Sequence, residues 1–316
     1  MTEETQTTRK VIIIGGGIAA HAAAVYAARA NMQPLVLSAP ELDQLSYTTE
    51  VENYPGFPEG IQGPDLVNNA KKQAQKFGAE YKVGKVDAVA VNDDKTLSVT
   101  VKDTTYTALS VIIATGASAR MLGVPGEQHF FGKGVSSCAV CDAAFYKDKE
   151  VVIIGGGDSA MEETLILSRF AKKITVIHRR DEFRASKIMQ KRVKGMTDKV
   201  YIKWNTVVTE VLGEKQVTGV KLKDVQTGKE ETFPTNGVFL AIGHIPNVSF
   251  VKDIIELDEG YIKTDELRAT SVPGIFAAGD VQDRIFKQAI TSAGSGCQAA
   301  LSAERYVEKL EAEREE

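Results

Sequence analysis

The chain has 316 residues, and its 38 lysines and arginines against 42 aspartates and glutamates give a net charge of −4. At about 150 residues per domain, this length predicts two domains. The slight acidic excess argues against a nucleic-acid-binding protein, which normally carries a basic surface. Hydrophobic residues make up 43% and charged residues 25%, as in an ordinary globular chain, which excludes disordered and collagen-like proteins.

The beginning of the chain and its cysteine content bear on where the protein works. The segment MTEETQTTRK has neither the basic nor the apolar region of a signal peptide, and no apolar run approaches the ~18 residues of a membrane helix. Three cysteines are an odd number, which argues against a secreted disulfide scaffold. We therefore expect a cytoplasmic protein that does not bind membranes.

One sequence pattern occurs twice, as VIIIGGGIAA at residues 11–20 and as VVIIGGGDSA at residues 151–160. Each copy is a β-branched run, three glycines and a helix-compatible segment, which is the first unit of a dinucleotide-binding fold. Two copies favour nucleotide binding over two ordinary strand-to-helix turns. We expect an α/β protein with two Rossmann-like three-layer dinucleotide-binding domains, the second inserted in the first.

Three positions of each turn have a physical role. The first glycine permits the tight turn off the strand, the next lets the backbone approach a pyrophosphate, and a small third residue lets the helix pack on the strand. These positions are Gly15, Gly17 and Ala20 in the first copy, and Gly155, Gly157 and Ala160 in the second. The helix that follows offers backbone N–H groups and a positive dipole end to phosphates.

The residues after the second strand of each copy distinguish the two nucleotides. Residues 178–184 read HRRDEFR, with three arginines where the adenosine ribose would lie. Because the planar fork of arginine suits a 2′-phosphate, the second copy is predicted to bind NADPH. The first copy has no acid at its strand end and only Glu41 as a loose ribose contact. We interpret that copy as the FAD site.

Further Gly-containing strand ends organise the chain. The segments VIIATG (111–116) and FLAIG (239–243) are expected to be strands where the chain leaves and re-enters the first domain. The predicted domains are 1–117 for the first part of the FAD domain, 118–245 for the NADPH domain and 246–316 for the second part of the FAD domain. The last segment is expected to complete the first sheet, and its Asp280 could hydrogen-bond a ribityl hydroxyl.

The reactive centre is predicted at Cys138-Ala-Val-Cys141. Cysteines at this spacing can close a small disulfide ring, and a helix N-terminus would lower the thiolate pKa. Zinc normally needs four ligands, and no second pair exists, so no metal is expected. Asp142 is either a proton-transfer group or an ordinary helix-start residue. Cys297 is expected to be a small buried hydrophobe, and an inert core pair is the alternative to a redox pair.

The chain resembles a known family through an ordered series of motifs. GGGIAA, TTEVENYPGFPEGI, VIIATGA, CAVCD, VVIIGGGDSAMEE, HRRDEFRASK, AIGHIPN, GIFAAGDV and KQAITSAGSGCQAAL occur in the order of the low-molecular-weight thioredoxin reductases, over about residues 10–310. The cysteine pair inside the second nucleotide domain is the most specific mark. Glutathione-reductase-like relatives carry their pair near the first Gly-rich motif instead.

The resemblance implies a homodimeric enzyme that passes electrons from NADPH through FAD and the Cys138–Cys141 disulfide to thioredoxin. It implies that Cys141 faces the flavin, that Cys138 attacks thioredoxin and that Asp142 is the acid–base group. It also implies a rotation of the inserted domain about two hinges near residues 117 and 245.

The expected cofactor residues follow from the turns and from the resemblance together. Those expected at FAD are Gly15, Gly17, Ala20, Gln44, Asn53, Gly116, Asp280, Gln288 and Ala289. Those expected at NADPH are Gly156, Gly157, Asp158, Ser159, Ala160, His178, Arg179, Arg180, Arg184 and Gly243.

Some positions depart from the family pattern. Ile18 and Ala20 replace the usual proline and glycine, Leu42-Asp43 replaces two glycines beside the flavin, and Lys287 replaces a frequent arginine. Two other functions share these motifs. One is a flavoprotein reductase of another dithiol protein, such as a peroxiredoxin or a glutaredoxin-like protein, and the other is a non-catalytic redox sensor. The intact cysteine pair with Asp142 argues against the sensor.

Overall fold

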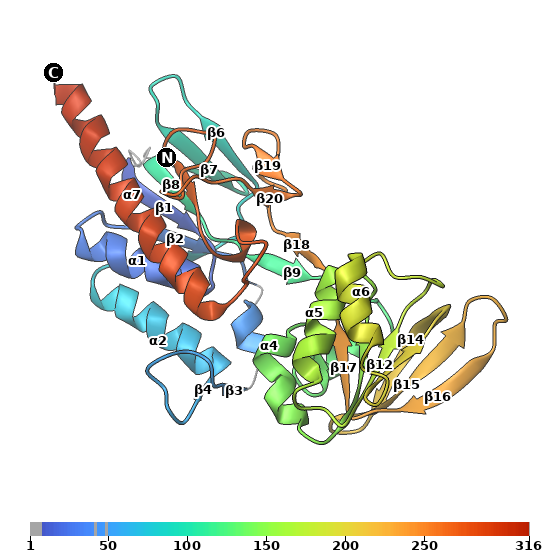
Figure 1. Cartoon of the computed structure of the whole chain (residues 1–316). Helices are drawn as coiled ribbons and strands as arrows, with labels where there is room; N and C mark the ends of the chain where they lie inside the picture. Colours follow the sequence, from blue (N-terminus) through green and yellow to red (C-terminus); the bar gives the residue numbers. More distant parts are fainter. Residues whose placement is uncertain (1–7, 41–42, 48–49, 316) are drawn as a thin grey trace. The chain divides into compact units, whose positions relative to one another are not determined.

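The computed structural model describes residues 8–40, 43–47 and 50–315, and these form two compact units (Figure 1). Unit 1 comprises Met1–Ser118 and Pro246–Glu316, and unit 2 comprises Ala119–Ile245. The chain therefore crosses between the units twice. Leu42 and Glu41, which the sequence analysis singled out, lie outside the described residues.

The first part of unit 1 contains β1 (Arg9–Ile14), α1 (Ile18–Arg29), β2 (Leu35–Ser38), the 3₁₀ helix η1 (Gln44–Tyr47), β3 (Glu50–Val51), β4 (Ile61–Gln62), α2 (Gly63–Lys76), β5 (Glu80–Val83), β6 (Ala88–Val91), β7 (Leu97–Val101) and β8 (Thr104–Ile113). Its second part contains β19 (Leu257–Asp258), β20 (Tyr261–Ile262), β21 (Ile275–Ala277), η3 (Gly279–Val281) and α7 (Ala289–Glu315).

The main sheet of unit 1 has the order β5-β2-β1-β8-β7-β6, with β21 also paired to β8. Strands β5, β2, β1, β8 and β21 are parallel, whereas β8, β7 and β6 are antiparallel neighbours. The return segment thus supplies a strand to this sheet, through the pairs from Ile275↔Val111 to Ala277↔Ile113. This confirms the expectation that the end of the chain completes the first sheet.

Unit 1 has three layers because side chains of β1 point alternately to opposite faces. Val11 and Ile13 pack on one side with α1 and α7, and Ile12 and Ile14 pack on the other side with β7. All four are at most 3% exposed, and full burial of such a side chain contributes about 1.5–3 kcal/mol. Figure 1 shows α1, α2 and α7 together on the helical side.

Unit 2 contains α3 (Glu127–Phe130), β10 (Val135–Ser136), α4 (Ala139–Asp142), η2 (Ala143–Tyr146), β11 (Glu150–Ile154), α5 (Asp158–Leu167), β12 (Lys173–Ile177), α6 (Lys187–Lys194), β13 (Val200–Lys203), β14 (Thr206–Gly213), β15 (Val217–Asp224), β16 (Glu230–Pro234) and β17 (Gly237–Leu240). The two crossings are β9 (Ala117–Ala119) and β18 (His244–Pro246), which pair with each other.

The central sheet of unit 2 is fully parallel, with the order β10-β17-β11-β12-β13. Val151 and Ile153 of β11 pack toward the side of α4, α5 and α6, whereas Val152 and Ile154 pack toward the antiparallel sheet β14-β15-β16. Unit 2 is therefore a second three-layer α/β fold, and the fold class predicted from the sequence is confirmed.

The two Gly-rich turns have equivalent geometry. Gly15 has φ +143° and Gly155 has φ +157°. A Cβ at Gly15 would overlap the carbonyl oxygen of Ala114 beyond β8, and one at Gly155 would overlap that of Ala241 beyond β17. Both turns therefore need glycine because the neighbouring strand of the same sheet passes so close.

Candidate active site

The carboxyl edge of the parallel sheet gathers the predicted residues of unit 2. The carboxyl ends of parallel strands meet at one edge of a sheet, where ligands of such folds bind. Along that edge, Cys138 follows β10, Gly243 follows β17, Gly155–Gly157 follow β11 and His178–Arg184 follow β12. The fold of unit 2 thus aligns the cysteine pair, the Gly-rich turn and the arginines in one row.

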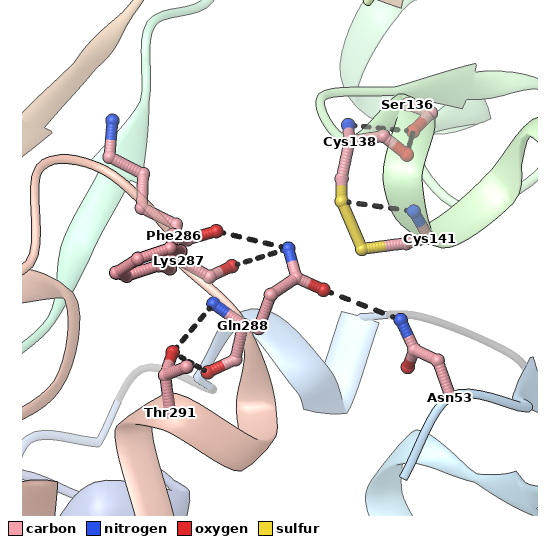
Figure 2. Close-up of a disulfide and its surroundings, with 8 residues drawn as sticks. All are labelled: Asn53, Ser136, Cys138, Cys141, Phe286, Lys287, Gln288 and Thr291. Atoms are coloured by element: carbon pink, nitrogen blue, oxygen red, sulfur yellow. Dashed lines mark hydrogen bonds between the residues drawn. A yellow bond between two sulfur atoms is a disulfide. The ribbon is translucent and has the colours of Figure 1, made fainter. Parts of the chain in front are cut away.

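Cys138 and Cys141 form a disulfide with a Cα–Cα distance of 5.3 Å (Figure 2). Cys138 is the N-cap residue of α4, and its Sγ accepts a hydrogen bond of 3.2 Å from the Cys141 N–H. A helix N-terminus stabilises a thiolate because of the unpaired N–H groups. Ser136, which is 5% exposed, accepts a hydrogen bond of 3.0 Å from the Cys138 N–H and fixes the entry to the helix.

Asp142 is the last residue of α4, next to the disulfide. Burial raises the pKa of its carboxyl, and a hydrogen bond from the Ser136 hydroxyl opposes that rise. The carboxylate makes no capping hydrogen bond for η2, which begins one residue later. Asp142 also lies in the first turn of α4, as the helix-start alternative expects. A carboxyl with a raised pKa beside a dithiol is in addition suited to hold and release a proton.

The three arginines of unit 2 occupy an exposed loop after β12. Within the described residues, no guanidinium group of Arg179, Arg180 or Arg184 makes an ion pair or a hydrogen bond. The loop is held against the Gly-rich turn, because the N–H groups of Arg184 and Ala185 donate to the Gly156 carbonyl over 2.7 Å and 3.1 Å. Three uncommitted arginines beside a phosphate-binding turn fit NADPH.

His178 lies under the same turn. A Cβ at Gly156 would overlap the His178 ring, which also packs against Phe183 and Trp204 at ring-centroid distances of 5.6 Å and 6.1 Å. Burial lowers the pKa of His178, and the charges of the neighbouring arginines lower it further. Its buried Nε2 has no hydrogen-bond partner in the described structure.

The remaining predicted residues of unit 2 lie at the start of α5. The carboxylate of Asp158 accepts hydrogen bonds from the N–H (2.9 Å) and the hydroxyl (2.8 Å) of Ser186, the N-cap residue of α6. Ser159 is exposed, whereas Ala160 is fully buried below the turn. A Cβ at Gly157 would contact nothing within 4 Å, which leaves room for a pyrophosphate.

The Gly-rich turn of unit 1 also fits a pyrophosphate. Gly17 is the N-cap residue of α1, no side chain caps the helix, and its first turn carries no acidic residue. Gly116 has φ +67°, and a Cβ there would meet nothing within 4 Å. The nearby Asp43 directs its carboxylate into its own turn, where it accepts hydrogen bonds from the N–H groups of Leu45 and Ser46.

Other predicted flavin residues are connected by hydrogen bonds within unit 1. Gln44 donates to the Ala117 carbonyl over 2.7 Å. Asn53 donates to the Gln288 side chain over 3.3 Å, and Gln288 in turn donates to two backbone carbonyls just before Ala289, where α7 begins (Figure 2). The structure thus brings together side chains that are more than 200 positions apart in the sequence.

Asp280 lies in η3, directly after β21. Burial raises the pKa of its carboxyl to about 6. The hydroxyl of Ser292, in the first turns of α7, donates a hydrogen bond of 2.9 Å to Asp280 Oδ1. Ser292 and Ser136, which act on these two carboxyl groups, were not predicted, because such contacts arise from the tertiary fold. Cys297 is half-buried rather than fully buried as expected.

The described residues show neither a cluster of metal ligands nor a membrane-spanning helix. They contain no group of three or more His, Cys, Asp and Glu side chains that could hold a metal ion. In the same part of the chain, no helix combines the length and apolar character needed to cross a membrane.

Comparisons with known proteins agree with this geometry. The family model "Pyridine nucleotide-disulphide oxidoreductase" matches residues 9–296. A thioredoxin reductase of Mycolicibacterium smegmatis is 50% identical over 306 residues, covering 96% of this chain and 98% of the relative. A bifunctional thioredoxin reductase/thioredoxin of Mycobacterium leprae is 48% identical, and the alignment covers 96% of this chain and 66% of the relative.

Solved structures of thioredoxin reductases are also similar to this chain over nearly its whole length. The thioredoxin reductase of Streptococcus pyogenes has a TM-score of 0.91 at 41% identity, covering 96% of this chain and all of the other. That of Giardia duodenalis has a TM-score of 0.89 at 39% identity, with the same coverage. The chain therefore belongs to the pyridine nucleotide-disulphide oxidoreductases and, within them, to the low-molecular-weight thioredoxin reductases. It is an oxidoreductase of the class that uses FAD and NADPH.

Proposed function

We propose that unit 1 binds FAD, that unit 2 binds NADPH, and that electrons leave through the Cys138–Cys141 disulfide to thioredoxin. When bound, FAD would accept a hydride from NADPH and return the electron pair to the disulfide. The observation that carries the proposal is the row at the carboxyl edge of unit 2, where the disulfide, the Gly-rich turn and three unpaired arginines follow neighbouring strands.

The chemistry of the chain's own residues follows from the disulfide. Reduction of the Cys138–Cys141 bond takes up two electrons and two protons and leaves two thiols. One thiolate then attacks the disulfide of thioredoxin and forms a mixed disulfide, which the second thiol opens as the Cys138–Cys141 bond forms again. Asp142 is the acid–base group of this cycle, because burial favours its protonated form beside the sulfurs.

The cofactors are held by the two turns and their surroundings. In unit 2 the guanidinium groups of Arg179, Arg180 and Arg184 would bind the 2′-phosphate, and the start of α5 would bind the pyrophosphate. In unit 1 the start of α1 would bind the FAD pyrophosphate. Asp280 would accept a hydrogen bond from a ribityl hydroxyl.

Unit 2 must alternate between two tasks, since both the nicotinamide and the disulfide have to reach the flavin. We infer a rotation of unit 2 about the two crossings. The inference is supported by the way Asn247 joins the crossings on the side of unit 1, where its side chain donates to the Thr115 carbonyl (2.9 Å) and its N–H to the Gly116 carbonyl (3.0 Å). On the side of unit 2, beside the paired strands β9 and β18, the Arg120 N–H donates to the Gly243 carbonyl over 2.9 Å. A few residues of this kind suffice for a hinge.

The experiment that tests the proposed function is an NADPH-driven disulfide-reduction assay across a panel of thioredoxins, with the visible spectrum of the purified protein taken first. We expect a yellow protein, non-covalently bound FAD and turnover with at least one thioredoxin. A colourless protein that takes up no added FAD would contradict the proposal. Turnover only with a peroxiredoxin or a glutaredoxin-like protein would identify that protein, and not thioredoxin, as the partner.

We also propose that the protein is a cytoplasmic homodimer, as the family resemblance implies. Sedimentation equilibrium of the flavin-loaded protein should give twice the chain mass of 34.2 kDa, and a single-chain mass at micromolar concentration would contradict the dimer.

A further inference from the structure

The carboxylate of Asp280 has one side-chain partner in the described structure. Ser292 Oγ donates to its Oδ1 over 2.9 Å, and the serine itself is only 7% exposed. The second carboxylate oxygen, Oδ2, makes no hydrogen bond to any described residue. The pair therefore presents one occupied and one available acceptor at the end of β21.

Both partners are fixed by further contacts. The Ser292 N–H donates to the Gln288 carbonyl over 2.9 Å, and Ser295 Oγ donates to the Ser292 carbonyl over 2.9 Å. Ser295 Oγ also accepts a hydrogen bond of 2.9 Å from the Gly279 N–H, directly before Asp280. The two serines thus connect the start of α7 to the residues that end β21, which fixes the backbone of Ser292 beside Asp280.

The neighbouring charges have smaller effects on the pKa of Asp280 than the Ser292 hydroxyl has. Burial raises the pKa of Asp280, and the hydrogen bond from Ser292 is the largest effect that opposes this rise. Among the neighbouring charges, Asp283 raises the pKa further and Lys287 lowers it. Asp283 is engaged by the backbone N–H groups of the loop that follows it. The Lys287 ammonium lies over the Tyr261 ring at 5.3 Å. No described cation forms an ion pair with Asp280.

We propose that Ser292 is a positioning residue of the flavin site, which keeps the Asp280 carboxylate ionised and turns its free oxygen toward a hydroxyl donor of the ligand's polyol chain. The proposal rests on the proposed binding of FAD to unit 1. A carboxylate accepts a hydrogen bond from a neutral hydroxyl best when it is ionised. Loss of the serine hydroxyl removes the largest effect that stabilises this charge in a desolvated position and leaves the weaker effect of Lys287.

The test is the release of FAD from the holoenzyme, measured as recovered flavin fluorescence between pH 5 and pH 8. For the wild type we expect release as the pH falls through the pKa of Asp280. In Ser292→Ala the midpoint of release should lie about one to two pH units higher, because a hydrogen bond to a charged group is worth about one to two pKa units. An unchanged midpoint would overturn the proposal.

Controls separate positioning from a loss of folding. Ser302 lies on the same helix, and its hydroxyl makes no hydrogen bond to any described residue. Ser302→Ala should therefore leave the midpoint of FAD release unchanged. Ser292→Thr keeps the hydroxyl and should restore the wild-type midpoint. If Ser292→Ala still shifts the release profile in an Asp280→Asn background, the serine acts through the fold and the proposal is wrong. A wild type that binds no FAD would contradict the proposed function instead.

Discussion

At the scale of single residues, the chemistry of unit 2 depends on how burial and hydrogen bonds act on a few groups. Ser136 hydrogen-bonds the Cys138 N–H and also acts on Asp142. One small buried hydroxyl therefore links the entrance of the dithiol helix to the acid–base candidate at its end. The sequence offers no sign of this, since many serines precede cysteines without bonding them.

Asp142→Asn tests the acid–base role and the stability of unit 2 together. Burial raises the folded-state pKa of Asp142 above its unfolded value, so the group favours folding most below pH ~3.8 and loses that contribution as the pH rises through the folded-state pKa. We expect Asp142→Asn to have a higher Tm than the wild type at pH 7, with the difference shrinking toward pH 4.

The activity of the same variant should move in the opposite direction. Thioredoxin reduction should fall by about 10²-fold or more at pH 7, the range of a general acid–base contribution. An Asp142→Asn variant with wild-type turnover across this pH range would show that the proton of the dithiol cycle is handled by another group.

Arg180→Gln tests whether this arginine recognises the 2′-phosphate of NADPH. Because no described carboxylate pairs with this arginine, its removal leaves no buried charge unpaired. A hydrogen bond to a charged group contributes about 1.5–3 kcal/mol, and about 1.4 kcal/mol corresponds to tenfold. We expect kcat/KM for NADPH to fall by about tenfold or more, and kcat/KM for NADH to stay within about twofold. Equal losses for both nucleotides would indicate a structural role.

At the scale of elements, the two strand–turn–helix units could be predicted because their signals are local. The β-branched runs form β1 and β11, and the three glycines end each strand where its turn has to pass a neighbouring strand. Other elements have no such signal. The sheet β14-β15-β16 and the strands β6 and β7 bury only one face and vary in length, so their pairing depends on the core that they cover.

The site could be predicted only as far as its residues follow a motif. The two cysteines form one short sequence cluster and the arginines form another, and both clusters follow strands of the same parallel sheet. His178 is expected at the cofactor from its motif, but the motif does not indicate that its ring also packs against Trp204, 26 positions further on. Such contacts, like that of Ser292 with Asp280, arise from the tertiary fold and leave no pattern in the sequence.

The turn between β11 and α5 provides a prediction at this scale. In Gly155→Ala the new Cβ would overlap the Ala241 carbonyl oxygen at φ +157°, so the free energy of unfolding of unit 2 should fall by about 2–5 kcal/mol. Gly228→Ala is the matched control, because Gly228 has φ +73° but nothing within 4 Å of an added Cβ. It should cost only about 1 kcal/mol, as measured by chemical denaturation. Equal costs would mean that backbone strain, not the close approach, makes glycine necessary at position 155.

At the scale of the whole molecule, the two units repeat one fold and differ in the residues around their Gly-rich turns. Each unit presents a Gly-rich turn at the carboxyl edge of a parallel sheet, but only unit 2 has arginines after its second strand and a disulfide after β10. The paired crossings β9 and β18 connect the two units. The central claim is that electrons from NADPH leave the protein only through Cys138 and Cys141.

That claim is tested most directly by Cys138→Ser and Cys141→Ser, in a comparison of flavin bleaching by NADPH with NADPH-driven reduction of thioredoxin. Bleaching needs the nucleotide alone, whereas exit of the electrons needs both sulfurs. We predict that both variants bleach like the wild type and that neither turns over thioredoxin. Cys138→Ser, which retains the thiol expected to face the flavin, should additionally show a long-wavelength charge-transfer band. Sustained reduction of thioredoxin by either single variant would contradict the account.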